Sequence, residues 1–198
     1  MNRAFLSFAI SFLLLCTFRL PARAQALAGA HVGDNASKLA RLGKPAAIDK
    51  YKPFLVQKWT LANSNEVSVT LDASEKIVYV ESDWGGHQEA TGCDLGDLRF
   101  GVTTLADLRK RFGSNGFGFK GRGGVAEIPG GVVLMNSYET GTVVVTFFTK
   151  VLDTEPGDQT PIADRAKLDA LSIASAEYAS TEWGERVYDP KYKKINWK

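Results

Sequence analysis

A cluster of residue types that can do chemistry lies between residues 81 and 97 of this 198-residue chain. The segment reads ESDWGGHQEATGCDLGD and holds carboxylates, an imidazole and a thiol at Asp83, His87, Glu89, Cys93, Asp94 and Asp97. Such groups bind metal ions, and a cysteine with a histidine can act as a nucleophile and its base. The chain has no H-x-x-x-H and no C-x-x-C, which are typical metal-ligand spacings. We therefore expect a solvated acidic linker without a catalytic residue or a metal, and keep an exported hydrolase or metal-dependent enzyme centred on residues 81–97 as an alternative.

A second chemical pattern, GFGFKG at residues 116–121, satisfies G-x-G-x-x-G. The dinucleotide fingerprint needs a strand before it and a helix after it, so that the helix N-terminus meets the pyrophosphate. Here a helical pattern precedes the glycines, and the glycine-rich run 121–131 follows them. The sequence therefore predicts a flexible hairpin at this point, and we expect no cofactor.

The first 24 residues have the composition of a secretory signal. Arg3 provides a basic start, residues 4–18 are apolar, and Ala22 and Ala24 are the small residues that a signal peptidase reads. The apolar run is about 15 residues long, whereas a membrane-spanning helix needs about 20. We expect cleavage after residue 24, a periplasmic or secreted product, and no integral membrane segment in that product.

Charge and cysteine content narrow the partners further. Residues 1–24 hold three of the 24 Lys and Arg and none of the 22 Asp and Glu, so the remainder has a formal charge of −1. Without a basic excess, the electrostatic basis for nucleic-acid binding is missing, and we expect no such partner. Cys16 leaves with the signal, so Cys93 has no intrachain disulfide partner and is predicted to be a half-buried apolar residue near Leu95.

The elements that must position these residues include two short helices of similar design. Residues 101–113 (GVTTLADLRKRFG) lie between glycines, with an apolar stripe at Leu105, Leu108 and Phe112. Residues 33–45 (GDNASKLARLGKP) repeat the design with a thinner stripe. In both, a side chain that can cap the helix precedes the stripe and a glycine ends it.

Segments rich in β-branched residues follow each helix, separated by turn residues. They span residues 53–61, 66–71 and 76–83 after the first helix, and 131–138 and 143–151 after the second. This order predicts an α+β fold built from tandem helix-plus-antiparallel-meander repeats that form one sheet surface. The expected units are repeat 1 at residues 25–90, repeat 2 at 91–155, and a C-terminal helix and extended tail at 156–198.

The predicted C-terminal helix begins at Pro161, which suits the first helical position, and ends at Gly184. Its apolar face consists of Leu168, Leu171, Ala174 and Tyr178. The tail that follows, residues 186–198, is expected to be extended and to pack through Tyr188, Tyr192 and Trp197.

The two glycine-bracketed segments resemble the helices of the superfamily of β-lactamase-inhibitory proteins and outer-membrane-assembly lipoproteins. The resemblance rests on two motifs, G-x(9)-G-K-P at residues 33–45 and GVTTLADLRKRFG at residues 101–113. It covers residues 32–151. It implies a helix-then-sheet fold in tandem and an exported location.

The function that these patterns favour is a non-catalytic protein-binding module of the bacterial cell envelope. An antiparallel sheet with one uncovered face is a platform for a partner. The residues expected to contact an envelope or extracellular protein are Trp59, Tyr79, Trp84, Phe117 and Phe148. A structural spacer is the other non-catalytic alternative, and exposure of these five aromatic side chains on one surface would favour binding over it.

Overall fold

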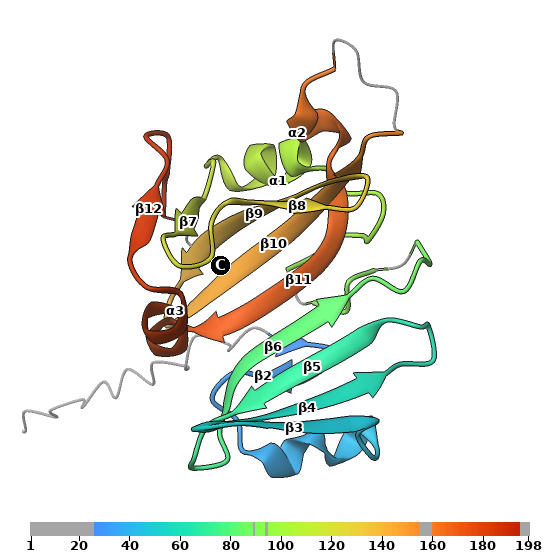
Figure 1. The fold of residues 1–198 in the computed structure, drawn as a ribbon, viewed down its shortest axis with the longest axis vertical. Helices are drawn as coiled ribbons and strands as arrows, with labels where there is room; N and C mark the ends of the chain where they lie inside the picture. Colours follow the sequence, from blue (N-terminus) through green and yellow to red (C-terminus); the bar gives the residue numbers. More distant parts are fainter. Residues whose placement is uncertain (1–25, 89, 94, 155–159, 195–198) are drawn as a thin grey trace, which may run out of the picture.

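The computed structural model describes residues 26–88, 90–93, 95–154 and 160–194. The predicted signal peptide, residues 1–24, lies outside the described residues, as does Trp197. Most of the described chain forms one large antiparallel sheet with a few short helices (Figure 1), which confirms an α+β fold. Within these residues no helix is both long and apolar enough to cross a membrane.

The elements follow one another as a helix and a meander, twice, and then a mixed C-terminal segment. The first part contains β1 (Ala26–Leu27), β2 (Ala30–His31), η1 (Ala36–Leu42), β3 (Ala47–Tyr51), β4 (Phe54–Thr60), β5 (Glu66–Leu71) and β6 (Ile77–Asp83). The second contains α1 (Leu105–Phe112), β7 (Phe117–Phe119), β8 (Val125–Ile128), β9 (Gly131–Thr140) and β10 (Val143–Leu152). The last contains α2 (Ile162–Arg165), β11 (Lys167–Ser175), α3 (Ala176–Trp183) and β12 (Arg186–Tyr188). The five strands predicted from β-branched segments are confirmed as β4, β5, β6, β9 and β10.

The large sheet has the strand order β12-β7-β9-β10-β11-β6-β5-β4-β3, and β8 also pairs with β9. Both meanders advance from an outer edge towards β11, which pairs antiparallel with β10 on one side and with β6 on the other. β6 and β10 therefore run parallel to each other. η1 and α1 pack into the same core cluster through Leu39 and Leu108, and the two meanders approach β11 from opposite sides of the sheet.

The predicted C-terminal helix is wrong over most of its length. Residues 167–175 form the central strand β11, and only Ile162–Arg165 and Ala176–Trp183 are helical. Leu168, Leu171 and Ala174 do recur with a helical spacing. However, β11 is buried on both faces between β10 and β6, and a strand of that kind is a nearly continuous apolar run that periodicity does not separate from a buried helix.

The two faces of the sheet differ in what lies over them. The covered face presents Val67, Val80, Val145, Phe147 and Ile173, and the β1–β2 hairpin, η1, α1 and residues 91–100 pack on it. The opposite, open face presents Thr70, Tyr79, Val144, Phe148 and Ser172, and α3 packs on it over β10 and β11. Figure 1 looks onto the open face, with β2 and η1 behind the sheet and nothing in front of β3, β4 and β5.

The two glycine-bracketed helices end up with different geometry. In α1, Thr104 and Asp107 form a capping box, and Gly113 closes the helix in the left-handed conformation at φ 59°. Its buried residues are Leu105 and Leu108. The first segment forms the 3-10 helix η1, whose one buried residue is Leu39. Ala36 and Leu42 also pack against the core but are only partly buried, so this helix has less tertiary support than α1, and short helices depend on such support.

Candidate functional site

The acidic segment at residues 81–97 does not bring its cysteine and histidine together. His87 is exposed, whereas Cys93 is 8% exposed in the main core and its backbone bridges to Leu27. Glu89 and Asp94 lie outside the described residues. Among the residues that the structure describes, no three His, Cys, Asp or Glu side chains are arranged to hold a metal ion.

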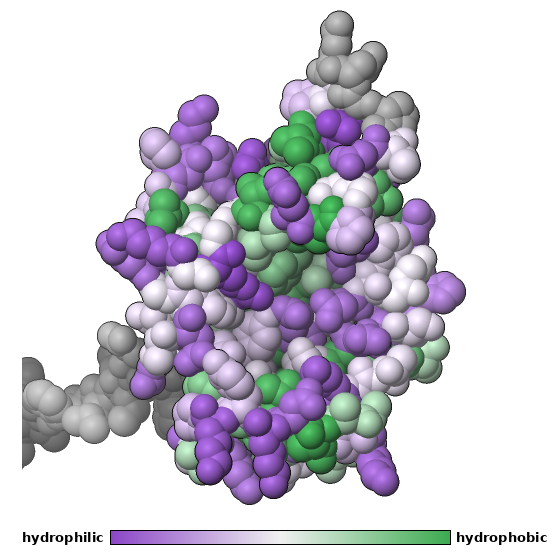
Figure 2. Space-filling view, in the orientation of Figure 1, coloured by the Kyte–Doolittle hydropathy of each residue, from purple (hydrophilic) through white to green (hydrophobic). Residues whose placement is uncertain are grey.

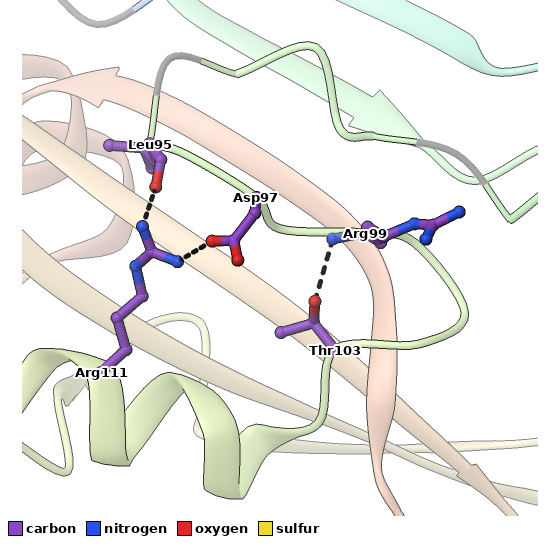
Figure 3. A network of polar contacts seen from close by, with 5 residues as sticks. All are labelled: Leu95, Asp97, Arg99, Thr103 and Arg111. Atoms are coloured by element: carbon purple, nitrogen blue, oxygen red, sulfur yellow. Dashed lines mark hydrogen bonds and ion pairs between the residues drawn. The ribbon is translucent and has the colours of Figure 1, made fainter.

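The expectation of a solvated linker is wrong for the second half of this segment. Leu95, Leu98 and Phe100 are buried in the core, and a close view (Figure 3) shows how polar contacts fix the chain between them. The Arg111 guanidinium of α1 donates to the Leu95 carbonyl at 2.8 Å and to the Asp97 carboxylate. The hydrogen bond from Arg111 holds the pKa of Asp97 below its usual value. Asp97 is thus used to attach the segment to α1.

The five aromatic residues predicted to bind a partner do not lie on one exposed surface. Trp59 is 4% exposed on the covered face, where its indole nitrogen donates to the Gly43 carbonyl at 3.1 Å. Trp84 packs against the same core, partly buried. Tyr79 and Phe117 are buried in a second cluster on the open face, and Phe148 is half-buried on that face.

The open face carries an unbroken row of aromatic rings, which we call the aromatic row. In order of contact it consists of Tyr51, Phe54, Tyr178, Tyr79, Trp183, Phe119, Phe117 and Tyr188. Neighbouring ring centroids lie between 5.1 Å (Phe119 and Trp183) and 6.5 Å (Tyr51 and Phe54) apart. The row begins on the edge strand β3 and ends on the edge strand β12. Its two ends are solvent-accessible, with Tyr51 64% and Tyr188 48% exposed.

Arg122 closes over the middle of the aromatic row. It comes from the glycine-rich loop between β7 and β8, and its guanidinium carbon lies 4.3 Å from the centre of the Trp183 ring and 4.8 Å from that of Phe148. Its Nη2 is 3.3 Å from the Tyr79 hydroxyl and 3.6 Å from a carboxylate oxygen of Glu81. Rings that sandwich a guanidinium stabilise it through their negative faces.

The polar groups beneath Arg122 are strongly coupled. The Tyr79 hydroxyl donates to Glu81, and burial, followed by the negative charge of Glu81, raises the pKa of Tyr79. Nη1 of Arg122 is buried without a hydrogen-bond partner among the described residues. A desolvated donor of this kind is costly, and native proteins contain few of them.

A group of carboxylates lies on the open face beyond Arg122. Burial raises the pKa of Asp83 to about 7, and the charges of Glu81, Glu66 and Asp169 raise it further in the same direction. Two of these carboxylates have a cation nearby: Arg122 Nη2 lies 3.6 Å from Glu81, and Lys150 Nζ lies 4.0 Å from Asp169. Figure 2 shows this face, with pale and green surface in the centre and hydrophilic, purple residues around it.

Sequence reasoning found Tyr79, Phe117 and Phe148 but missed the residues that join them. Tyr178 and Trp183 lie in the C-terminal segment, which was predicted to pack as one long helix, and Arg122 lies in a glycine-rich run without periodicity. The alternation of residues along β4 could have corrected one of these predictions. Successive side chains of a strand point to opposite faces, so Trp59 lies on the same face as Leu55, which packs against the core, whereas Phe54 lies on the other face.

Comparisons with known proteins add little. No family model matches the chain, and no curated protein matches it. Among solved structures, a DUF4309 family protein from Bacillus subtilis is 16% identical, with a TM-score of 0.38 over 70% of this chain and 76% of that one. A likeness of that size carries no argument about fold or function.

Proposed function

We propose that this protein is an exported, non-catalytic protein-binding module of the bacterial cell envelope, and that it binds its partner on the open face. The observation that carries the proposal is the aromatic row, which crosses the sheet from edge to edge and is accessible at Tyr51 and Tyr188. The secretory composition of residues 1–24 supports the compartment. The partner is an envelope or extracellular protein.

The chemistry of the row fits protein recognition. Tyrosine, tryptophan and arginine are the residues that most often dominate binding energy at protein interfaces. In this face the inner rings are buried against one another and against α3, which holds the exposed rings in fixed positions. Rigid aromatic anchors lose little conformational entropy on binding.

The tandem organisation belongs to the same proposal. We take residues 25–90 and 91–155 as two helix-plus-meander units that flank β11, each contributing one wing of the binding face. Tyr51 and Phe54 come from the first wing, and Phe117 and Phe119 from the second. Tyr188 and α3 in residues 156–198 complete the surface.

One residue, Asp83, supports the alternative that the protein is an enzyme. Asp83 lies in the acidic segment, and its pKa of about 7 is suited to a general acid. An exported hydrolase would use Asp83 together with Glu81, the adjacent carboxylate on the same face.

A capture experiment with matched variants tests the binding proposal. The mature protein is immobilised and exposed to cell-envelope extract with crosslinking, and the same is done for the Tyr51→Ala/Tyr188→Ala double variant. Ile48→Ala is the control, because Ile48 lies on the same edge strand, is 54% exposed and faces the other side of the sheet. We expect one partner to be retained by the wild type and the control, and its recovery to fall at least about tenfold with the double variant.

Two results would contradict the proposal. Equal recovery with the double variant would place the binding surface elsewhere. Capture of no specific partner by any form would favour the structural spacer.

A further inference from the structure

We propose that a groove beside Arg109 binds a small amphiphilic anion, in which a carboxylate or phosphate group is attached to an apolar body. The groove lies at the end of the sheet formed by β7, β8, β9 and β12 (Figure 1) and has a volume of about 480 Å³. Small-molecule sites in proteins have volumes of this order. The groove adjoins the proposed partner surface, because Phe117, Phe119 and Tyr188 of the aromatic row are among its lining residues, but its polar anchor, Arg109, belongs to α1.

The groove exists because two short strands share one edge of β9. β8 pairs with β9 at residues 131–134, and β7 pairs with it at Ser137, which leaves Met135 and Asn136 between them. The chain that bridges this interval is rich in glycine, so side chains do not fill it. A Cβ on Gly124 would meet no atom within 4 Å, and one on Gly118 would meet only backbone atoms at 3.7 Å or more.

Arg109 supplies the polar end of the groove. It lies in the last turn of α1, and it lines both this groove and an adjoining hollow of about 350 Å³. Its Nε is buried and has no hydrogen-bond partner in the described part of the chain. A charged donor that is desolvated in this way is stabilised by an anion within hydrogen-bond distance.

The charges around Arg109 favour an anion over a cation. Lys191 and Lys193 line the adjoining hollow, and no ion pair holds either of them or Arg109 within the residues described here. The carboxylate among the lining residues is Asp189, which already accepts from the Lys191 amide at 2.7 Å and from the Asn115 side chain at 3.3 Å. Net positive charge therefore surrounds Arg109, which is half-buried.

The walls of the groove specify the other half of the ligand. Val125, Leu134, Met135 and Val187 present apolar surface, and of these Val125 and Val187 are 58% and 50% exposed. Covering such side chains with an apolar body removes their surface from water, which is favourable. A ligand with both parts is thus preferred over an inorganic anion or a neutral hydrocarbon.

Calorimetric titration of the mature protein with four matched probes tests this preference. The probes are hexanoate, hexan-1-ol, hexylammonium and inorganic phosphate. We expect hexanoate to bind at least about tenfold more tightly than each of the others, since a charge-assisted hydrogen bond and the apolar contact act together. Equal binding of hexanol or hexylammonium would overturn the proposal.

Variants on α1 and β12 identify the groove as the site. Arg109→Ala is expected to weaken hexanoate binding at least about tenfold, and Arg109→Lys to recover only part of it, because lysine has no Nε donor in that position. Lys110→Ala is the matched control, being the next residue on the helix, exposed and outside the lining. Val187→Glu, at an exposed position that tolerates change, should weaken binding by like-charge repulsion even if Arg109→Ala does not fold. Unchanged hexanoate binding in Val187→Glu would contradict the proposal.

A further titration with a peptide distinguishes a free small molecule from the carboxyl terminus of a polypeptide as the ligand. A hexapeptide that ends in leucine is compared as the free carboxylate and as the amide. Tighter binding of the free acid than of hexanoate identifies the carboxylate as the end of a polypeptide, and the reverse order identifies a free small molecule. Binding of neither hexanoate nor the peptide acid would overturn the proposal.

Discussion

The two faces of the sheet use aromatic and apolar residues in different ways. On the covered face, Phe147 and Tyr138 are fully buried and contact Phe112 of α1, so their rings are enclosed by a helix. On the open face the rings contact one another in a row, and the covering consists of α3, Arg122 and Tyr192 of the C-terminal tail. The row continues to both edges of the sheet instead of ending in a core.

The difference is consistent with a covered face that stabilises the fold and an open face that carries the proposed recognition. Burial of apolar area on the covered face supplies most of the hydrophobic stabilisation, since that cluster joins residues from β1 to β11. The open face retains features that cost stability, namely the desolvated Nη1 of Arg122 and the repelling carboxylates around Asp83. Such features are maintained where a surface has a function.

The largest expected effect is on the covered face. Phe147→Ala should lower the free energy of unfolding by about 3–5 kcal/mol, because it opens a cavity in a close-packed core. Urea denaturation monitored by tryptophan fluorescence measures the change. Val102→Ala, at a 42% exposed position, is the control, with a shift within about 0.5 kcal/mol. A loss below about 1 kcal/mol for Phe147→Ala would mean that the covered face is not the stabilising one.

A smaller effect is expected from removal of the arginine on the open face. Arg122→Ala should destabilise the protein by about 1–2 kcal/mol, because the guanidinium no longer interacts with the Trp183 and Phe148 rings. Recovery of the captured partner should fall more strongly than stability does. Lys120→Ala is the matched control from the same loop, since its ion pair with Glu185 is exposed on both sides. Loss of stability without loss of the partner would make Arg122 a structural residue only.

The two faces are expected to respond to pH in opposite directions: the contribution of Asp83 to stability falls as pH rises, whereas that of Asp97 falls as pH decreases. The pKa of Asp83 is raised from its ordinary value of 3.8 to about 7, so the folded protein holds this proton more tightly than the unfolded chain does. Asp83 therefore contributes stability below about pH 4 that is lost as pH rises to about 7. Asp83→Asn should remove this decline, and the midpoint of urea denaturation as a function of pH measures it.

Asp97 provides the comparison for Asp83, because the shift of its pKa has the opposite direction. Arg111 lowers the pKa of Asp97, so its contribution is present at neutral pH and is lost as pH falls through that lowered value. Asp97→Asn should thus cost stability at pH 7 and change little in strong acid. If the stability change caused by Asp83→Asn varied with pH in the same direction as that caused by Asp97→Asn, the environment described for Asp83 would be contradicted.

Local patterns in the sequence predicted the parts of the fold that local physics determines. The alternation in β5 and the turn residues on either side specified that strand without error, and the threonine cap and Gly113 specified α1. β11 was missed because a strand that is buried on both faces lacks alternation. The strand β3 was missed because all five of its residues are exposed and no apolar periodicity marks them.

The candidate site depended on contacts that sequence spacing does not encode. Phe54 meets Tyr178, and Tyr79 meets Trp183, only because β11 brings α3 beside β6. The stretch of glycines before β8 gave no indication that Arg122 would lie over the Trp183 ring. The parity of Trp59, in contrast, was readable from β4 and would have removed it from the set of surface residues.

The smallest expected effects are on the acidic segment, where the two residues first considered for catalysis can be compared directly. His87→Ala should change the free energy of unfolding by no more than about 0.5 kcal/mol, because the side chain is exposed and the hydrogen bond to this residue, from the Trp84 indole, uses its backbone carbonyl. Cys93→Ser should cost about 1–3 kcal/mol, since it puts a hydroxyl into an apolar core. Native Cys93 should also react with an aromatic disulfide reagent much more slowly than in urea, because a thiol that is 8% exposed presents little surface to attack. Rapid labelling of the folded protein would show that residues 90–93 open readily. Such opening would make the thiol accessible, and Cys93 would then have to be reconsidered as a reactive residue under the enzyme alternative.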